Sequence, residues 1–109
     1  MNLDETKQKY LSTQLIAYIG NKRALLGLIE QALRSTQIQT GGFLDLFAGS
    51  GSVSRLAKTL GFSVYSNDWE FYSYVINEAY LKINDEDLSR MFITKGGILQ
   101  VLHTLNSLK

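Results

Sequence analysis

Residues 43–53 read FLDLFAGSGSV, a short apolar run followed by a glycine-containing turn and the start of a helical pattern. The run from Phe43 to Phe47 is apolar except for Asp45, which is typical of a strand covered on both faces in a parallel sheet. Gly49 and Gly51 let the backbone pass close to a ligand where a β-carbon would collide. Ligands of open α/β sheets bind beyond the carboxyl ends of the strands, so this turn predicts a ligand site.

The segments around this stretch alternate between helical and extended patterns. Phe62 to Tyr65 alternates as a second strand and ends at Asn67-Asp68, while residues 1–15 are polar and predict an irregular arm or a frayed helix. Gly61 ends the helix that follows the turn, and Ser50 or Ser52 is placed to cap its start. Apolar residues recur at helical spacing in residues 22–34, 53–60, 72–83 and 98–105, which predicts four helices. Residues 84–87 predict the cap of a further short helix. This order predicts an α/β unit with a right-handed crossover.

Composition excludes several classes of protein. The chain has 109 residues, enough for one domain, and no cysteine, which removes disulfides, thiolate catalysis and cysteine-based zinc sites. A single histidine predicts no metal site, and a net charge of +1 without a basic stripe predicts little DNA binding by this chain alone. No apolar stretch reaches the roughly 20 residues of a membrane span, and the N-terminus lacks a signal-peptide core. We therefore expect a soluble, cytoplasmic domain.

The residues around the glycine turn narrow the class of ligand. Gly51 is followed by Ser52 rather than by the lysine of a phosphate-binding loop, and Ser54 stands where a dinucleotide fingerprint needs its third glycine. Asp45 in the strand end disfavours a pyrophosphate and suits a ligand with an ammonium group. S-adenosylmethionine carries an ammonium, a carboxylate and a sulfonium, and therefore fits this turn.

Asp68 and Trp69 follow the second strand, next to the expected site. Asp68 can accept hydrogen bonds from both hydroxyls of a ribose, or it can simply cap the helix that begins there. Trp69 can lie against an adenine ring, or it can be a partly buried packing residue. For Asp68 or Trp69 taken alone, the structural role explains the residue at least as well as ligand binding does. The combination with Asp45, which is costly in an apolar strand unless something pairs with it, favours the nucleoside reading.

Three stretches, in this order, resemble the D12 class of bacterial DNA adenine-N6 methyltransferases. They are YIGNKR at 18–23, FLDLFAGSGSV at 43–53 and SNDWEFYSYVINEAY at 66–80, and the resemblance covers about residues 16–83. It implies an incomplete Rossmann-like S-adenosylmethionine-dependent methyltransferase fold of the α/β class, with an N-terminal helix, the first β-α-β units and following helices. Residues 16–109 would form this partial, cofactor-binding domain behind an irregular arm at 1–15.

The resemblance also assigns roles to residues. It implies that Lys22 contacts the cofactor carboxylate within a pocket shaped by Tyr18 and Gly20, that Asp45 faces the ammonium, and that Asp68 binds the ribose. The expected cofactor-binding set is Tyr18, Gly20, Asn21, Lys22, Asp45, Phe47, Ala48, Gly49, Ser50, Gly51, Asp68 and Trp69. The alternative for Lys22 is a solvated lysine at a helix start.

One departure from the family concerns the chemistry. Family members hold the target adenine with a motif containing two prolines, and this chain contains no proline, so we expect no catalytic residue in it. The resemblance implies that target recognition and catalysis reside in later parts that this chain lacks. We therefore expect the S-adenosylmethionine-binding portion of a restriction-modification enzyme that methylates adenine N6 in DNA, inactive by itself. DNA would be the partner of the complete enzyme, with weak or no binding to this chain.

Two further expectations remain open. A two-stranded sheet leaves unpaired edges and faces, which predicts self-association or stabilisation by a complementing chain. The alternative functions are a fragment of an RNA or small-molecule methyltransferase, and a degenerate interaction module that keeps the fold without the ligand.

Overall fold

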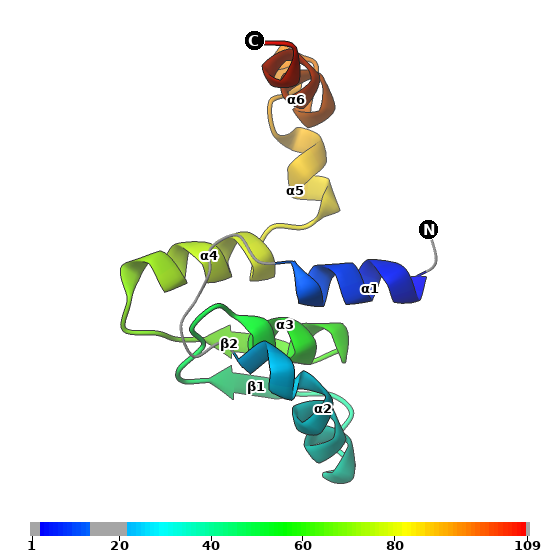
Figure 1. The fold of residues 1–109 in the computed structure, drawn as a ribbon, viewed down its shortest axis with the longest axis vertical. Coiled ribbons are helices and arrows are strands. Elements are labelled where there is room, and N and C mark those ends of the chain that lie inside the picture. The colour runs from blue at the N-terminus through cyan, green and yellow to red at the C-terminus, as the bar shows by residue number, and fades with distance from the viewer. Residues whose placement is uncertain (1–2, 14–21, 109) are drawn as a thin grey trace.

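The computed structural model describes residues 3–13 and 22–108 and shows a mixed helix and strand architecture (Figure 1). Its elements in chain order are α1 (Leu3–Ser12), the 3-10 helix η1 (Lys22–Leu25), α2 (Leu26–Ser35), β1 (Gly42–Asp45), α3 (Ser52–Thr59), β2 (Ser63–Ser66), α4 (Phe71–Leu81), α5 (Asp85–Arg90), the 3-10 helix η2 (Ile93–Lys95) and α6 (Ile98–Ser107). The predicted alternation of helix and strand is confirmed. Of the two expectations for residues 1–15, an irregular arm or a frayed helix, the irregular arm is wrong where it is described, because α1 is a helix.

The two strands pair in parallel, with Leu44 opposite Tyr65 and Asp45 opposite Ser66. Backbone bonds continue past the strand ends, since Asn67 N donates to Asp45 O over 2.8 Å and Ala48 N to Asn67 O over 2.9 Å. The carboxyl ends of both strands are thereby joined just before the chain turns away. This joint places the segment after β1 next to the segment after β2.

The core lies on one face of this sheet. Helix α3 packs between the strands and α4, and it buries Val53, Leu56 and Ala57 as its periodicity predicts. The opposite face is open: Leu44 is 61% exposed and Tyr65 is 65% exposed. The expectation that β1 is covered on both faces is therefore wrong among the described residues, because their helices cover only the α3 side.

A buried arginine attaches α1 to this core. Arg55 of α3 is 1% exposed, and its Nη1 donates to the carbonyl oxygens of Tyr10 at 2.7 Å and Thr13 at 2.8 Å. Its guanidinium lies 4.2 Å from the ring centroid of Tyr80, whose carbonyl accepts the Tyr10 hydroxyl at 2.6 Å. Burial lowers the pKa of Arg55, and the two tyrosines oppose this effect. The charge is tolerated because carbonyls at the negative end of α1 and an aromatic face receive it.

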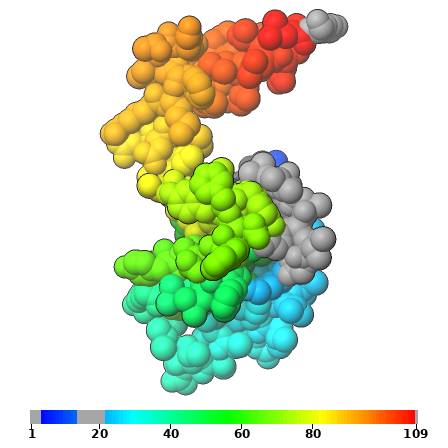
Figure 2. Space-filling model, turned by 90° about the vertical axis from the view of Figure 1, so that its left-hand side faces the viewer, coloured from blue at the N-terminus to red at the C-terminus, as the bar shows by residue number. Residues whose placement is uncertain are grey.

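The chain after α4 leaves the body of the molecule. Figures 1 and 2 show that α5, η2 and α6 lie apart from the sheet and its helices. This extended arrangement gives the Cα atoms a radius of gyration of 15.9 Å. The predicted cap of α5 is confirmed, because Asn84 and Asp87 form a reciprocal capping box. Within residues 3–13 and 22–108, none of the helices is both long and apolar enough to span a membrane.

Candidate functional site

The glycine turn joins β1 to α3 through two left-handed residues, Gly49 at φ +54° and Gly51 at φ +74°. Gly51 N donates to Ala48 O over 2.8 Å, and Gly51 O accepts from Arg55 N over 2.8 Å, which starts α3. The predicted serine cap is wrong. Gly51 itself is the N-cap residue and no side chain caps the helix, while Ser50 Oγ and Ser52 Oγ lie 2.9 Å apart.

Asp68 lies against this turn, as the sequence predicts. Its Oδ2 accepts from the Gly49 N–H at 2.8 Å and its Oδ1 from the Glu70 N–H at 3.0 Å. Helix α4 begins at Phe71 with Glu70 as N-cap and no side-chain cap, so the reading of Asp68 as a simple helix cap is wrong. A carboxylate offers about four acceptor positions, and these two bonds leave others for a ligand.

Lys22 also contacts the segment that forms this turn. Its Nζ donates to the carbonyl oxygen of Phe47 at 2.8 Å, so the reading of Lys22 as only a solvated helix-start lysine is wrong. An ammonium has three donors, and two more remain beside this bond. Tyr18, Gly20 and Asn21, which belong to the same predicted motif, lie outside the described residues.

Asp45 is buried beneath the turn rather than exposed at it. It is 7% exposed, and its Oδ2 accepts from the hydroxyl of Ser54 at 2.8 Å. Ser54 is fully buried and its Oγ also lies 3.3 Å from Ser66 Oγ. The partner that makes an acid tolerable in β1 is thus a hydroxyl of α3, within the protein itself.

The remaining predicted residues divide between buried and open positions. Ala48 and Ser50 are buried inside the turn, whereas Phe47 is 75% exposed and Trp69 is 95% exposed. The reading of Trp69 as a partly buried packing residue is wrong, because its ring lies almost wholly in solvent. Phe47 directly precedes the glycine turn and Trp69 follows β2, and both aromatic rings are open to a ligand or partner.

Two residues that the sequence did not single out bind the turn from α4. Ser73 Oγ donates to Gly49 O at 2.5 Å and Asn77 Nδ2 to the same oxygen at 3.1 Å. The apolar periodicity of residues 72–83 predicts an inward stripe that includes Tyr72, Val75 and Ile76. Ile76 is buried as predicted, but Tyr72 and Val75 are exposed while Ser73 and Asn77 are buried. Two polar residues four positions apart in an otherwise apolar helix are the signal that could have identified this face.

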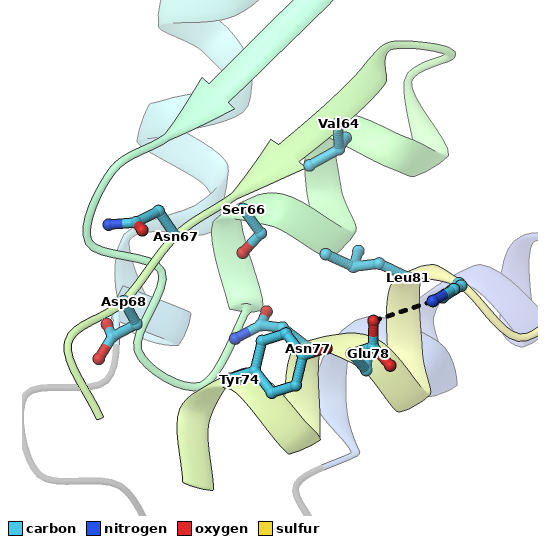
Figure 3. A pocket seen from close by; sticks show the side chains of 9 residues that line it. Val64, Ser66, Asn67, Asp68, Tyr74, Asn77, Glu78 and Leu81 are labelled. Carbon is cyan, nitrogen blue, oxygen red and sulfur yellow. Dashed lines mark hydrogen bonds and ion pairs between the residues drawn. The ribbon is translucent and has the colours of Figure 1, made fainter. Parts of the chain in front are cut away.

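A cavity of about 400 Å³ opens beside Asp68, between β2 and α4 (Figure 3). Asp68 and Asn77 both line it, together with Glu78 and Lys82, whose side chains form an ion pair at 3.1 Å. A second cavity is lined by residues that precede the strands, such as Thr40 and Phe62, at their amino ends. Ligands of open α/β sheets bind at the carboxyl ends. The first cavity reaches that end at Asp68 but is not lined by the glycine turn or by Lys22. Among the described residues, none of the His, Asp and Glu side chains group in threes that could hold a metal ion.

Comparison with known proteins identifies a family for most of the chain. The model of the D12 class N6 adenine-specific DNA methyltransferases matches residues 18–100. Modification methylase LlaI of Lactococcus lactis subsp. lactis is 40% identical over 80 residues, which cover 73% of this chain and 13% of the relative. Type II methyltransferase M.NlaIII of Neisseria lactamica is 40% identical over 67 residues, which cover 59% of this chain and 20% of the relative. Modification methylase StsI of Streptococcus sanguinis is 38% identical over 80 residues, which cover 72% of this chain and 12% of the relative. The chain therefore spans between 12% and 20% of the length of these relatives, and no solved structure matches it.

Proposed function

The chain belongs to the D12 class of N6 adenine-specific DNA methyltransferases, and on this basis we propose that it holds S-adenosylmethionine at the glycine turn. The family implies an S-adenosylmethionine-dependent methyltransferase fold. The parallel pair β1 and β2 with its helical crossover supports the finer proposal of an incomplete Rossmann-like sheet. The observation that carries the proposal is the 2.8 Å bond between Gly49 N and Asp68 Oδ2, because it joins the two predicted halves of the site.

The residues at the turn suit the groups of this cofactor. Lys22 would bind the carboxylate with its remaining donors, and Asp68 would accept the ribose hydroxyls. Asp45 would attract the ammonium from beneath, since its bond to Ser54 leaves further acceptor positions. Trp69 would lie against the adenine. When bound, the cofactor supplies a methyl group on a positively charged sulfur.

The close packing of the turn explains its second glycine. A β-carbon on Gly51 would lie 2.2 Å from Asn77 Oδ1, so the backbone of the turn already lies as close to α4 as atoms allow. Both glycines have positive φ, which bends the chain away from the strand ends. Packing against α4 therefore accounts for Gly51, whereas the fit to the cofactor rests on the remaining hydrogen-bonding positions of Lys22 and Asp68.

For the complete enzyme we propose methylation of adenine N6 in DNA within a restriction-modification system. The family description and the printed names of the relatives, modification methylase and type II methyltransferase, support this. The two-proline motif that the resemblance implies for the target adenine is not in this chain, which has no proline. We therefore propose that this chain is inactive alone. Transfer of labelled methyl groups to DNA by the purified chain would contradict this part.

Calorimetric titration with S-adenosylmethionine tests the binding proposal. Lys22→Ala and Asp68→Ala should each weaken binding by about tenfold to a hundredfold, because each removes a charge-assisted hydrogen bond. Lys95→Ala, in η2, is the matched charge control and should bind like the unaltered chain. Absence of binding heat with the unaltered chain would refute the proposal.

The open sheet face supports a partner as well as a ligand. Leu44 and Tyr65, paired across the strands and both exposed, leave an apolar surface on a parallel sheet that normally has two covered faces. We propose that the chain associates with itself or with a complementing chain through this face. If the chain were a ligand-free interaction module, association would persist and S-adenosylmethionine would not raise its thermal stability.

A further inference from the structure

The inward face of α4 carries two polar residues, Ser73 and Asn77, beside the apolar Ile76. Ser73 is fully buried and Asn77 is 6% exposed, and both donate to one acceptor, the carbonyl oxygen of Gly49. Asn77 Nδ2 also donates to Ser73 O at 2.8 Å, which holds its amide within the helix. The face is therefore shaped around a single peptide group of the turn.

Asn77 contacts both glycines of the turn. Its nitrogen must face Gly49 O and Ser73 O, since both are acceptors, and this fixes the orientation of the amide. The amide oxygen then lies in the space that a β-carbon on Gly51 would need, 2.2 Å from that position. Among the described residues this oxygen has no hydrogen-bond partner, although it is buried. An unsatisfied buried acceptor is costly, and the bonds of the amide nitrogen to Gly49 O and Ser73 O must offset this cost.

The bonds on the two sides of Gly49 connect α4 to Asp68. Its carbonyl is held by Ser73 and Asn77, and its N–H donates to Asp68 Oδ2 at 2.8 Å. The peptide groups before and after Gly49 are thus both fixed, at a glycine that could otherwise adopt many conformations. A change at Gly49 O would rotate the donor that orients the carboxylate.

We propose that Ser73 and Asn77 are positioning residues of the cofactor site, which act through Gly49 to hold the Asp68 carboxylate in one orientation. Neither residue needs to touch the cofactor for this role. The inference rests on the proposed function of Asp68 as the ribose acceptor. If it holds, the affinity for the nucleoside part of S-adenosylmethionine depends on the first two turns of α4 as well as on the strand ends.

The test is a double-mutant cycle on S-adenosylmethionine affinity, measured by calorimetry well below each variant's melting temperature. Ser73→Ala should weaken binding about tenfold in the chain with Asp68, and less than about twofold in the Asp68→Ala background. Ser89→Ala is the matched control, because Ser89 Oγ also donates to a helical carbonyl, Asp85 O at 2.8 Å, but on exposed α5. Equal losses in both backgrounds, or no loss from Ser73→Ala, would overturn the inference and leave the proposed function intact.

Hydrogen exchange at the Gly49 amide tests the same link without a ligand. The bond to Asp68 should protect this amide, and Ser73→Ala and Asn77→Ser should each increase its exchange rate at least about fivefold more than the fall in global stability predicts. Rapid exchange at Gly49 in the unaltered chain would overturn the inference. Protection that depends on Ser73, together with no binding of S-adenosylmethionine, would instead support the positioning link and refute the proposed function.

Discussion

Gly51 and Asn77 lie in such close contact that a β-carbon on the glycine would stand 2.2 Å from the amide oxygen of the asparagine. Gly51→Ala should therefore destabilise the chain by about 3 kcal/mol, from the left-handed backbone and the overpacking together. Urea unfolding would measure this loss. Gly27→Ala is the control, because Gly27 lies in α2 with no atom near its missing β-carbon, and it should gain up to about 1 kcal/mol. Equal stability of the two variants would show that the contact is absent.

Arg55→Met should release α1 from the core. The variant keeps the length of the side chain but removes the donors to Tyr10 O and Thr13 O, and should cost about 2 to 3 kcal/mol. Arg90→Met removes an exposed partner of Glu86 and should cost less than about 0.5 kcal/mol. Urea unfolding and limited proteolysis of α1 would check both. An intact, protease-resistant α1 in Arg55→Met would contradict the role of Arg55 as an anchor.

The contact between Arg55 and Tyr10 predicts a loss of folding stability at alkaline pH. Burial raises the pKa of Tyr10, partly offset by the positive charge of Arg55, so the folded state favours the neutral phenol. The contribution of the neutral Tyr10 phenol to the free energy of unfolding is complete below the ordinary tyrosine pKa of about 10. It is lost as the pH rises through the pKa of Tyr10 in the folded state. Tyr10→Phe should be less stable at neutral pH by about 1 kcal/mol, because it loses the bond to Tyr80 O. Its unfolding free energy should fall less steeply above about pH 10 than that of the unaltered chain. Parallel pH profiles would rule out Tyr10 as the titrating group.

Charge on the open sheet face should reduce association. Leu44→Lys and Tyr65→Lys each place an ammonium on the apolar surface of β1 and β2 and should weaken self-association by about fivefold or more. Gln31→Lys adds the same charge on exposed α2 and should have little effect. Light scattering over a range of concentrations would measure all three. A stable monomer at every concentration in the unaltered chain would contradict self-association.

The sequence predicted the features that depend on local pattern and turn chemistry. The glycine turn, the amphipathic α3 and the two short strands follow from residues close together in the chain, and the structure confirms each of them. The contacts of Lys22 with Phe47 and of Asp68 with Gly49 agree with the expectation that these segments meet at one turn. The roles of these residues toward a cofactor remain predictions.

The features that escaped prediction depend on partners far away in the sequence. The stripe on α4 was assigned from hydrophobicity, but Gly49 O selects Ser73 and Asn77 for the inward face, over 24 and 28 positions. Arg55 was overlooked because an arginine in a helix is usually exposed, and its acceptors lie 45 and 42 residues earlier. Helix α1 has a weak apolar pattern of its own, and this distant arginine holds it.

The arrangement around Arg55 also predicts an order of assembly. Its guanidinium lies between Tyr10 of α1 and Tyr80 of α4, and the hydroxyl of Tyr10 bonds to a carbonyl 70 positions later. Helix α1 is synthesised before α3 and α4, yet its docking site is complete only after the end of α4 has been synthesised. Contacts between such distant residues form late, because the loop between them must first be closed. We therefore expect α1 to dock after α3 and α4 have packed together.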